Sequence, residues 1–459
     1  MDGNGAVAVD LGDVQGLILR GYTMPVARCI GLAVREAAGA RAFLAAVTDD
    51  SAVPSVASAQ PWTVKPESCV NLGVTFAGLG ALGVSAQSRA SFPTEYAEGA
   101  VARAARVGDV GGSGPEGWLG WLTDPVLHLV LVVFAQSAAA LESATGQLQR
   151  AWAAGWRELG RHDGERLPGD VAHFGYRDGL SQPTVDGVPL SGLPDHLPRA
   201  PVGEFLLGYP SQFSGHSYPV PTPCALGVNG SFAALRVLEQ DVDGFTEFLT
   251  RQAARTGLAE ELVAAKLCGR WRNGTPLVLS PDTDTPEPPI PAEGLNDFDY
   301  VGEFADDRGY RCPVGSHVRR MYPRSSRVAG NAGHRHRIVR RGIPYGPPYD
   351  PAHPRDGQPR GLLGLFIGAS LADQFEFLMA RWLNDGTFAP GLGRARDPMA
   401  GANEPGVGRF SIPRRDGPIV LDGLPRFVTT RGGAYCFLPS ITGLRYLADL
   451  RPDPNPPGP

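Results

Sequence analysis

The first half of the chain alternates between short apolar segments and longer segments with the spacing of amphipathic helices. Residues 28–35 alternate apolar and polar side chains, which predicts a β-strand because successive strand residues point to opposite faces. The other predicted elements are strands at 70–76 and 127–134 and helices at 36–47, 77–82 and 137–156. The order β-α-β…β-α is typical of a ferredoxin-like sandwich, in which helices cover one face of an antiparallel sheet.

A similar pattern returns in the second half of the chain. The predicted elements there are strands at 205–209, 230–238 and 362–367, helices at 242–256, 260–269 and 373–383, and a hairpin formed by 425–430 and 434–438. A Pro-rich connection at 276–295 is too polar for a core. We therefore expect an α+β fold of two ferredoxin-like domains, each an antiparallel sheet with peripheral helices. The expected limits are 1–195, 196–450 and a Pro-rich tail at 451–459.

Composition and charge exclude several classes of function. Hydrophobic residues make up 42% of the 459 residues, and the formal net charge of −5 argues against nucleic-acid binding and against a membrane surface. The longest apolar run, at 126–135, is too short to span a bilayer. Six cysteines occur without CxxC spacing, which argues against a zinc ribbon or a dithiol centre. We see no signal-peptide pattern and expect a cytoplasmic protein.

Three unusual strings carry the candidate chemistry. They are Phe174–Pro183 with Asp178, Cys312–Arg324 with His317, and Arg337–Gly346 with Arg340. An imidazole, a carboxylate in a Gly-framed turn and a guanidinium are the groups needed to bind a haem iron and cleave a peroxide on it. Each string alone also has an ordinary interpretation: a surface or capping histidine, a common Asp-Gly turn, and one exposed arginine among many. Whether the three side chains converge in space therefore decides the function.

Chemistry gives each side chain a distinct role if the three do converge. His317 would supply a neutral nitrogen donor to iron, oriented by a hydrogen bond at its other ring nitrogen. Asp178 would take a proton from one peroxide oxygen and return it to the other, and its flanking glycines permit a positive φ. Arg340 would stabilise the negative charge that develops as the O–O bond breaks. Arginines just after His317 could pair with two haem propionates; they are Arg319, Arg320 and Arg324.

The other histidines have simpler interpretations. His334 and His336 lie in a polar segment without a nearby cysteine or carboxylate ligand, so we expect them on the exposed surface. His173 adjoins the Asp178 string and is expected to pack within that loop. His128 lies in an apolar strand and is expected to be a core histidine with its hydrogen bonds satisfied.

Together the three strings resemble the dye-decolorising peroxidase family, haem peroxidases with two ferredoxin-like domains. The resemblance covers nearly the whole chain, and its further segments are Asp13–Tyr22, Asn71–Gly83, Leu267–Trp271, Gln374–Asn384 and Gly432–Pro439. The length and the Pro-rich insertion are similar to those of the longer fungal and actinobacterial members. The resemblance implies haem b (iron protoporphyrin IX) in the C-terminal domain, near the domain interface. It also implies hydrogen peroxide as oxidant and small organic reductants, such as dyes and phenolics, as partners.

The resemblance assigns roles to individual residues. His317 matches the proximal iron ligand, Asp178 the distal acid–base residue and Arg340 the distal arginine. Arg320 matches an arginine that pairs with a propionate. Asp397 falls where the family places a carboxylate near the proximal imidazole, with Glu376 as the competing candidate. The remaining expected cofactor contacts are Gly179, Leu180 and Ser181 beside Asp178, and Leu365 and Ile367 in the distal wall.

The expected activity is the reduction of hydrogen peroxide coupled to one-electron oxidation of organic substrates. We expect an acidic optimum, because an ordinary aspartate titrates near ~3.9 and stays functional as a base at low pH. Bulky dyes cannot reach a buried haem, so Trp382 and Tyr349 are candidate electron relays, with simple packing as their alternative role. Competing interpretations are a haem carrier or sensor with little peroxidase activity, and a haem-free interaction protein. Mn(II) oxidation at surface carboxylates and the oligomeric state stay open.

Overall fold

The computed structural model describes residues 8–49, 53–188, 198–213, 216–387, 389–404 and 406–450. The predicted tail at 451–459 lies outside these residues. The strands are β1 Val26–Val34, β2 Ser68–Val74, β3 Leu129–Ala135, β4 Trp156–Glu165, β5 Ser231–Gln240, β6 Val339–Tyr345, β7 Gly361–Gly368, β8 Gly408–Ile412, β9 Ile419–Leu424 and β10 Val428–Leu438. The α-helices are α1 Gly16–Leu19, α2 Ala37–Thr48, α3 Phe76–Leu82, α4 Ala86–Arg89, α5 Thr94–Ala102, α6 Gly120–Thr123, α7 Ala138–Trp152, α8 Cys224–Gly227, α9 Val242–Thr256, α10 Glu260–Cys268, α11 His317–Met321 and α12 Ile441–Ala448.

Eight of these strands form one antiparallel sheet in the order β4-β1-β3-β2-β10-β5-β7-β6. The first four and the last four strands repeat one arrangement, in which the first and third strands of each half lie at the centre. This is the strand order of a ferredoxin-like sandwich, so the predicted α+β class with two ferredoxin-like halves is confirmed. The two halves meet edge to edge, where Phe437 of β10 pairs with Val74 of β2. The predicted limits of the domains stay a prediction.

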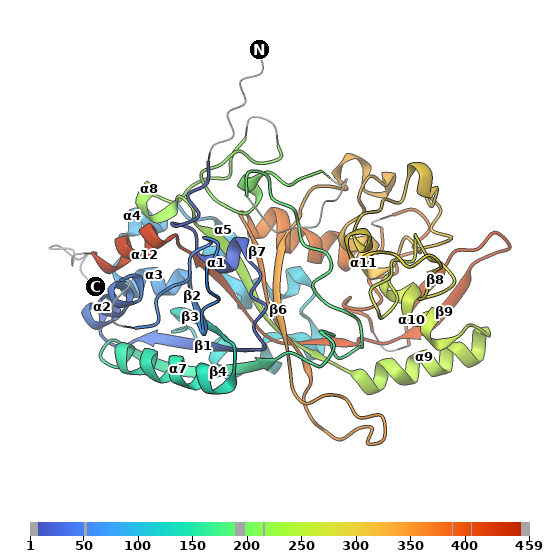
Figure 1. Cartoon of the computed structure of the whole chain (residues 1–459), viewed down its shortest axis with the longest axis horizontal. Helices are drawn as coiled ribbons and strands as arrows, with labels where there is room; N and C mark the ends of the chain where they lie inside the picture. The colour runs from blue at the N-terminus through green and yellow to red at the C-terminus, as the bar shows by residue number, and fades with distance from the viewer. Residues whose placement is uncertain are drawn as a thin grey trace, which may run out of the picture.

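The sheet has an apolar core on each face. On one face, α2, α7 and α12 cover strand residues such as Ile30 and Leu131, and Figure 1 shows α12 beside α2 although they lie at opposite ends of the chain. On the other face, the sheet curls around α1, whose Leu17 and Ile18 are buried in the second core. The edge strands approach one another there, since Gly164 of β4 lies against Ile343 of β6.

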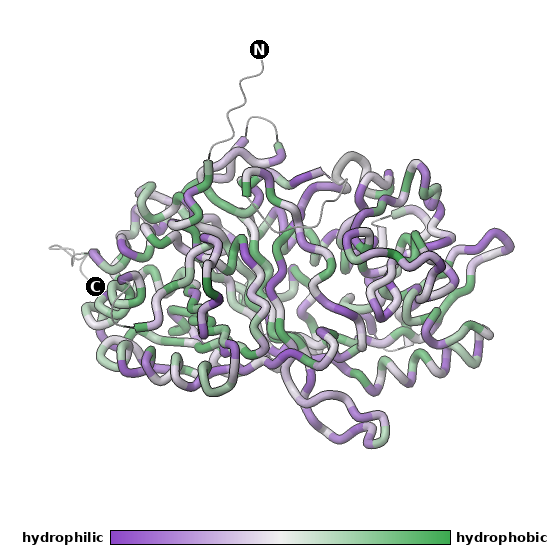
Figure 2. Tube along the Cα trace, viewed as in Figure 1, coloured by the Kyte–Doolittle hydropathy of each residue, from purple (hydrophilic) through white to green (hydrophobic). Residues whose placement is uncertain are grey.

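Insertions in the C-terminal half build a further layer beside the sheet. Helices α9 and α10 pack with the β8–β9 hairpin around Phe245, Phe248 and Phe427. Figure 2 shows that the outer end of this hairpin is hydrophilic. The layer encloses one side of a cavity on the C-terminal half of the sheet. Within the described residues, no helix is both long and apolar enough to cross a membrane.

Several predicted elements differ from those in the structure. The expected hairpin at 425–438 is the single strand β10, whose pairing with β5 shifts register between Thr430 and Gly432. Leu122 approaches Gly432 too closely for a side chain there. Residues 205–209, all buried except Gly208, form turns and bends rather than a strand. The expected helix at 373–383 is present, and it is formed by two π-helical segments, Leu371–Glu376 and Leu378–Leu383. Strand β4 escaped prediction because its residues are mostly polar and partly exposed.

Candidate active site

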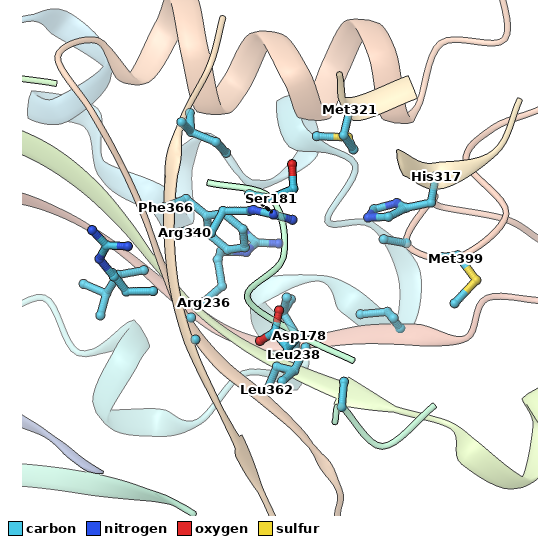
Figure 3. A pocket seen from close by; sticks show the side chains of 18 of the residues that line it. Asp178, Ser181, Arg236, Leu238, His317, Met321, Arg340, Leu362, Phe366 and Met399 are labelled. Carbon is cyan, nitrogen blue, oxygen red and sulfur yellow. Dashed lines mark hydrogen bonds between the residues drawn. The ribbon is translucent and has the colours of Figure 1, made fainter. Parts of the chain in front are cut away.

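A cavity of about 670 Å³ lies against the C-terminal half of the sheet. Its floor is formed by β5, β6, β7 and β10, and its walls by the loop after β4 and by α11. Figure 3 shows His317 on one side of this space and Asp178, Ser181 and Arg340 facing it from the other. The structure therefore brings the three predicted side chains, which lie up to 162 residues apart in the sequence, to one cavity.

His317 is the first residue of α11, and a buried carboxylate orients its ring. Its Nδ1 lies 3.0 Å from Oδ2 of Asp397. Backbone N–H groups of Met399 and Ala400 donate to the other oxygen, Oδ1, each at 2.9 Å. A ring that donates from Nδ1 to this carboxylate presents its Nε2 lone pair to the cavity. This is the arrangement that a histidine ligand to a metal requires.

Asp397 stays ionised although it is fully buried. Burial raises the pKa of this carboxyl, but the charge and hydrogen bond of His317, the Arg320 charge and the Ala400 N–H together hold its pKa below the ordinary value. An anionic partner makes the imidazole a stronger electron donor. The competing candidate, Glu376, lies elsewhere: its carboxylate accepts hydrogen bonds from Arg103 and Tyr435.

Asp178 lies in a compact loop that follows β4. The flanking Gly175 and Gly179 have φ values of 86° and 75°, so both glycines take the positive φ that the sequence predicted. The Asp178 N–H donates to the Asp170 carbonyl at 3.0 Å, and the Gly179 N–H donates to Oδ1 of Asp178 at 2.7 Å. These bonds fix the loop while the carboxyl remains exposed to the cavity.

Arg340 is attached to the same loop by three hydrogen bonds. Its Nη2 donates to the Ser181 carbonyl at 2.6 Å. The side-chain amide of Gln182 accepts from the Arg340 N–H at 3.1 Å and donates to the Arg340 carbonyl at 2.9 Å. These backbone groups are available because β6 is an edge strand of the sheet. The loop of the N-terminal half therefore places Asp178 beside an arginine of the C-terminal half.

The structure places one of the two predicted distal-wall residues at the cavity: Leu365 lines it, whereas Ile367 does not. Because side chains of a strand alternate, β7 presents Leu362, Gly364 and Phe366 to the cavity (Figure 3). Leu365 borders the cavity but belongs with Ile367 to the apolar core on the opposite face. Gly179 and Ser181 line the cavity as expected, whereas Leu180 does not and lies against Gly274 instead.

The predicted role of Arg320 in binding a propionate is not supported. Residues 317, 318 and 321 of α11 line the cavity, so helical periodicity turns Arg320 away from it. Arg320 is fully buried and donates to the carbonyls of Trp382, at 2.6 Å, and Ala395. Its guanidinium therefore holds together the chain segments that position Asp397.

A buried ion pair in the cavity floor was not predicted. Arg236 of β5 donates from Nη2 to Oδ1 of Asp109 at 2.6 Å and to Thr430 of β10 at 2.8 Å. Its side chain is only 2% exposed, so the pair links the two halves of the chain beneath the site. An arginine inside the apolar run of β5 was the one available sequence signal, because a buried charge needs a partner.

The donor set and the charge of the cavity fit a haem. The volume is within the range of about 300–1,000 Å³ typical of cofactor sites. Apolar side chains that suit a macrocycle include Leu238, Leu362 and Phe366. Seven arginines line the cavity against three aspartates, which suits a ligand that carries two carboxylates. His317 supplies the nitrogen donor.

The surrounding histidines only partly match the sequence prediction. His128 accepts a hydrogen bond from the Val34 N–H at 2.9 Å, as expected of a satisfied histidine. His334 and His336 are not simple surface residues: His336 lines the cavity, and His334 lies 2.9 Å from the Tyr322 hydroxyl. His173 is buried behind the Asp178 loop, with its Nε2 2.7 Å from the Tyr345 carbonyl.

We expect His173 to make the fold sensitive to acid. Burial lowers the pKa of His173. The hydrogen bond to the Tyr345 carbonyl raises this pKa, and the Arg360 charge lowers it further. The net result is a pKa below the ordinary value, so the ring of the folded protein stays neutral at a pH where a free histidine is protonated. As the pH falls below about 6.5, His173 binds a proton in the unfolded chain but not in the folded chain. Stability is then lost progressively until the pH passes the folded pKa. His173→Gln keeps a donor for the carbonyl and should reduce the loss in urea-unfolding free energy between pH 7 and pH 5.

The exposed His216 provides the matched control for this comparison. His216→Gln should leave the acid-induced loss unchanged, because its ring is solvated in both the folded and the unfolded state. An equal loss of stability in the wild type and in His173→Gln would contradict the assignment.

Comparison with known proteins identifies relatives over almost the whole chain. The chain is 28% identical to a dye-decolorizing peroxidase of Mycena epipterygia, covering 96% of this chain and 87% of the relative. A crystal structure of a fungal peroxidase of this type from Auricularia auricula-judae is 25% identical, with a TM-score of 0.81, over 96% of this chain and all of that chain. A dye-decolorizing peroxidase in complex with 2,6-dimethoxyphenol is 26% identical, with a TM-score of 0.80 and the same coverage. No family model matches the chain.

Sequence similarity over nearly the full length and a shared fold agree with one another. The relatives span the N-terminal half, which carries Asp178, as well as the C-terminal half with His317 and Arg340. These findings support the dye-decolorising peroxidase family, whose members are haem peroxidases, as the family of this chain.

Proposed function

We propose that this protein is a haem b-dependent peroxidase that reduces hydrogen peroxide and oxidises small organic molecules by one-electron steps. One observation carries the proposal: Asp178 and Arg340 face the His317–Asp397 pair across a single cavity. A haem carrier or sensor would need the histidine but neither the carboxylate nor the guanidinium. We therefore favour catalysis over the alternative of haem transport or sensing.

The cofactor, when bound through Nε2 of His317, supplies the electrons that reduce the peroxide. Asp178 accepts a proton from one oxygen of hydrogen peroxide and delivers it to the other, so that the departing oxygen leaves as water. Arg340 stabilises the negative charge on that oxygen while the O–O bond breaks. Asp397 holds the His317 ring in one tautomer and orientation throughout. The hydrogen bonds of Arg340 with Ser181 and Gln182 hold the Arg340 side chain and the Asp178 loop in fixed positions relative to each other.

Organic reductants then return the electrons, one at a time. A relative has been crystallised with 2,6-dimethoxyphenol, and we infer that phenols and dyes are the substrate class of this chain as well. Among the described residues, no group of three or more histidine, cysteine, aspartate or glutamate side chains suits a metal ion. Mn(II) oxidation stays an untested prediction.

An absorption spectrum of the hemin-loaded protein tests the proposal. We expect a Soret band that changes on addition of one equivalent of hydrogen peroxide and returns when a phenol is added. A protein that binds hemin but whose spectrum does not respond to peroxide would favour a carrier or sensor. A protein that takes up no hemin would overturn the proposal.

Arg340→Leu should lower the rate of peroxide reduction by about 10²–10³, the usual cost of removing one donor that stabilises developing charge. Stopped-flow absorbance at the Soret band gives this rate directly. Arg355→Leu is a suitable control, because Arg355 is an exposed arginine that pairs with Glu247 away from the cavity. An Arg340→Leu variant with an unchanged rate would remove Arg340 from the mechanism.

A further inference from the structure

Methionine side chains are concentrated around the cavity. The chain has five methionines, and three of them, Met321, Met379 and Met399, line the cavity. Of the described methionines, Met24 alone lies outside the lining, and it is 1% exposed in the apolar core around α1. A thioether fills an apolar wall as leucine does, but its sulfur can be oxidised to a sulfoxide. The cavity wall therefore carries oxidisable groups that packing alone does not require.

Two of these methionines lie on the side of the cavity that holds His317. Met321 follows His317 by one helical turn in α11, and both residues line the cavity. Figure 3 shows Met399 on this side as well, whereas Asp178 and Arg340 face the cavity from the other side. A peroxide held between Asp178 and Arg340 is therefore badly placed to deliver an oxygen atom to either sulfur. Electrons, by contrast, can cross the cofactor that fills the space between them.

Met399 differs from Met321 in its electrostatic surroundings. The Met399 N–H donates to Oδ1 of Asp397 at 2.9 Å, and this carboxylate is fully buried, so little solvent screens its charge. A sulfur that loses an electron becomes positive, and a neighbouring anion stabilises that charge. Met321 follows Arg319 and Arg320 in α11, and their positive charges oppose the same step. Of these two thioethers, Met399 is therefore the better electron donor.

Direct attack by dissolved peroxide is a poor route to the Met399 sulfur. The residue is only 7% exposed and packs into the apolar core that contains Phe245 and Phe410. Oxidation at this position therefore has to come from the cavity itself.

We propose that Met399 is an internal electron donor and a site of oxidative self-modification. In the absence of an organic reductant, its thioether gives two electrons to the oxidised cofactor and becomes methionine sulfoxide. The inference rests on the proposed peroxidase function. The donor takes the place of the missing phenol or dye, so that the oxidising power of the peroxide falls on a replaceable sulfur rather than on the cofactor.

The step balances with hydrogen peroxide as the only oxidant. Peroxide accepts two electrons and two protons and leaves as two water molecules. The Met399 sulfur loses those two electrons, one water molecule adds its oxygen to the sulfur, and the two protons of that water replace the two consumed. The net change converts one thioether and one hydrogen peroxide into one sulfoxide and one water. The sulfoxide oxygen thus comes from solvent water, whereas direct attack by free peroxide transfers a peroxide oxygen.

Peptide mass spectrometry with oxygen-18 peroxide in ordinary water tests the proposal. After several equivalents of peroxide without reductant, we expect the hemin-loaded protein to carry unlabelled sulfoxide at Met399. Oxidation at Met399 should be at least about 10-fold faster than at Met321, because a difference of only about 1.4 kcal/mol between the two sites gives that ratio. Met24 is the internal control and should stay unmodified. The hemin-free protein should gain little sulfoxide at Met399, and 2,6-dimethoxyphenol should suppress it in the loaded protein.

Met399→Leu tests the protective effect of the donor. The substitution nearly conserves volume and keeps the N–H that binds Asp397. Repeated additions of peroxide without reductant should bleach the Soret band faster in Met399→Leu than in the wild type. Met321→Leu is the matched control, because it removes a thioether from the same side of the cavity, and it should bleach at nearly the wild-type rate.

The outcomes separate this inference from the proposed function. Sulfoxide at Met399 that carries the peroxide label, or that forms equally without hemin, overturns electron donation by Met399. Equal oxidation of Met321 and Met399 overturns the role given to the Asp397 charge. A protein that reduces peroxide but gains no sulfoxide at Met399 overturns the inference and leaves the peroxidase function standing. A loaded protein whose spectrum does not respond to peroxide overturns both.

Discussion

Asp178→Asn should lower the rate of reaction with hydrogen peroxide by about 10²–10⁴, because asparagine cannot accept the proton that the carboxylate transfers between the two oxygens. Haem uptake should be unchanged, since His317, the proposed iron ligand, and its partner Asp397 lie on the opposite side of the cavity. The variant therefore separates proton transfer from cofactor binding. Stopped-flow absorbance measures the rate, and the Soret absorbance per protein measures the uptake.

The matched control for Asp178 is its neighbour in the same loop. Asp170→Asn also removes a cavity-lining carboxylate, but the contact between Asp170 and Asp178 is made through the Asp170 carbonyl, which the substitution retains. We expect the Asp170→Asn variant to react with peroxide far faster than the Asp178→Asn variant. Full peroxide reactivity of Asp178→Asn at acid pH would rule out Asp178 as the acid–base residue.

Arg236→Met should destabilise the protein by about 3–5 kcal/mol, the typical cost of leaving one partner of a buried ion pair without its counter-charge. Both side chains are nearly inaccessible, with exposures of 2% for Arg236 and 3% for Asp109. Because Asp109 belongs to the N-terminal half and Arg236 to the C-terminal half, the loss should appear as a lower urea midpoint for the whole chain. The double variant Arg236→Met/Asp109→Leu should recover part of the lost stability.

An exposed ion pair provides the contrast. Arg355 and Glu247 are 72% and 52% exposed, so Arg355→Met should change the free energy of unfolding by less than about 1 kcal/mol. If Arg236→Met cost no more than Arg355→Met, the Arg236–Asp109 pair would not be a structural link between the halves. A double variant less stable than Arg236→Met alone would show that the hydrogen bond from the Thr430 hydroxyl to Asp109 stabilises the fold even without Arg236.

The sequence predicted the local elements well where one physical signal dominated. Helix α9 begins and ends at the predicted residues, because a clear apolar stripe lies between Asp241, whose side chain accepts from the Gly244 N–H, and Gly257, which takes a positive φ. It failed for β10 and β4. In β10, a turn was expected between residues 430 and 434, but Gly432 instead makes room for Leu122 within a continuous strand. In β4, an edge strand carries few apolar residues.

The residues of the site, like the local elements, were only partly predictable from the sequence. The Gly-x-x-Asp-Gly loop was predictable, because only particular residues tolerate a positive φ there. The choice of Asp397 over Glu376 was not, since both carboxylates are buried and only the fold decides which one meets His317. The register of β7 was also hidden, because Leu362, Leu363, Leu365 and Phe366 are all apolar, and alternation alone does not say which face meets the cavity.

By itself, then, the sequence determined the ferredoxin-like halves and the three strings that carry the imidazole, carboxylate and guanidinium, because periodicity and turn chemistry are local properties. Only the tertiary structure decided that Gln182 attaches its loop to Arg340, that Arg320 points away from the cavity, and that Tyr322 meets His334. Such pairings depend on how distant segments pack, and packing is settled by the whole chain rather than by any one segment of it.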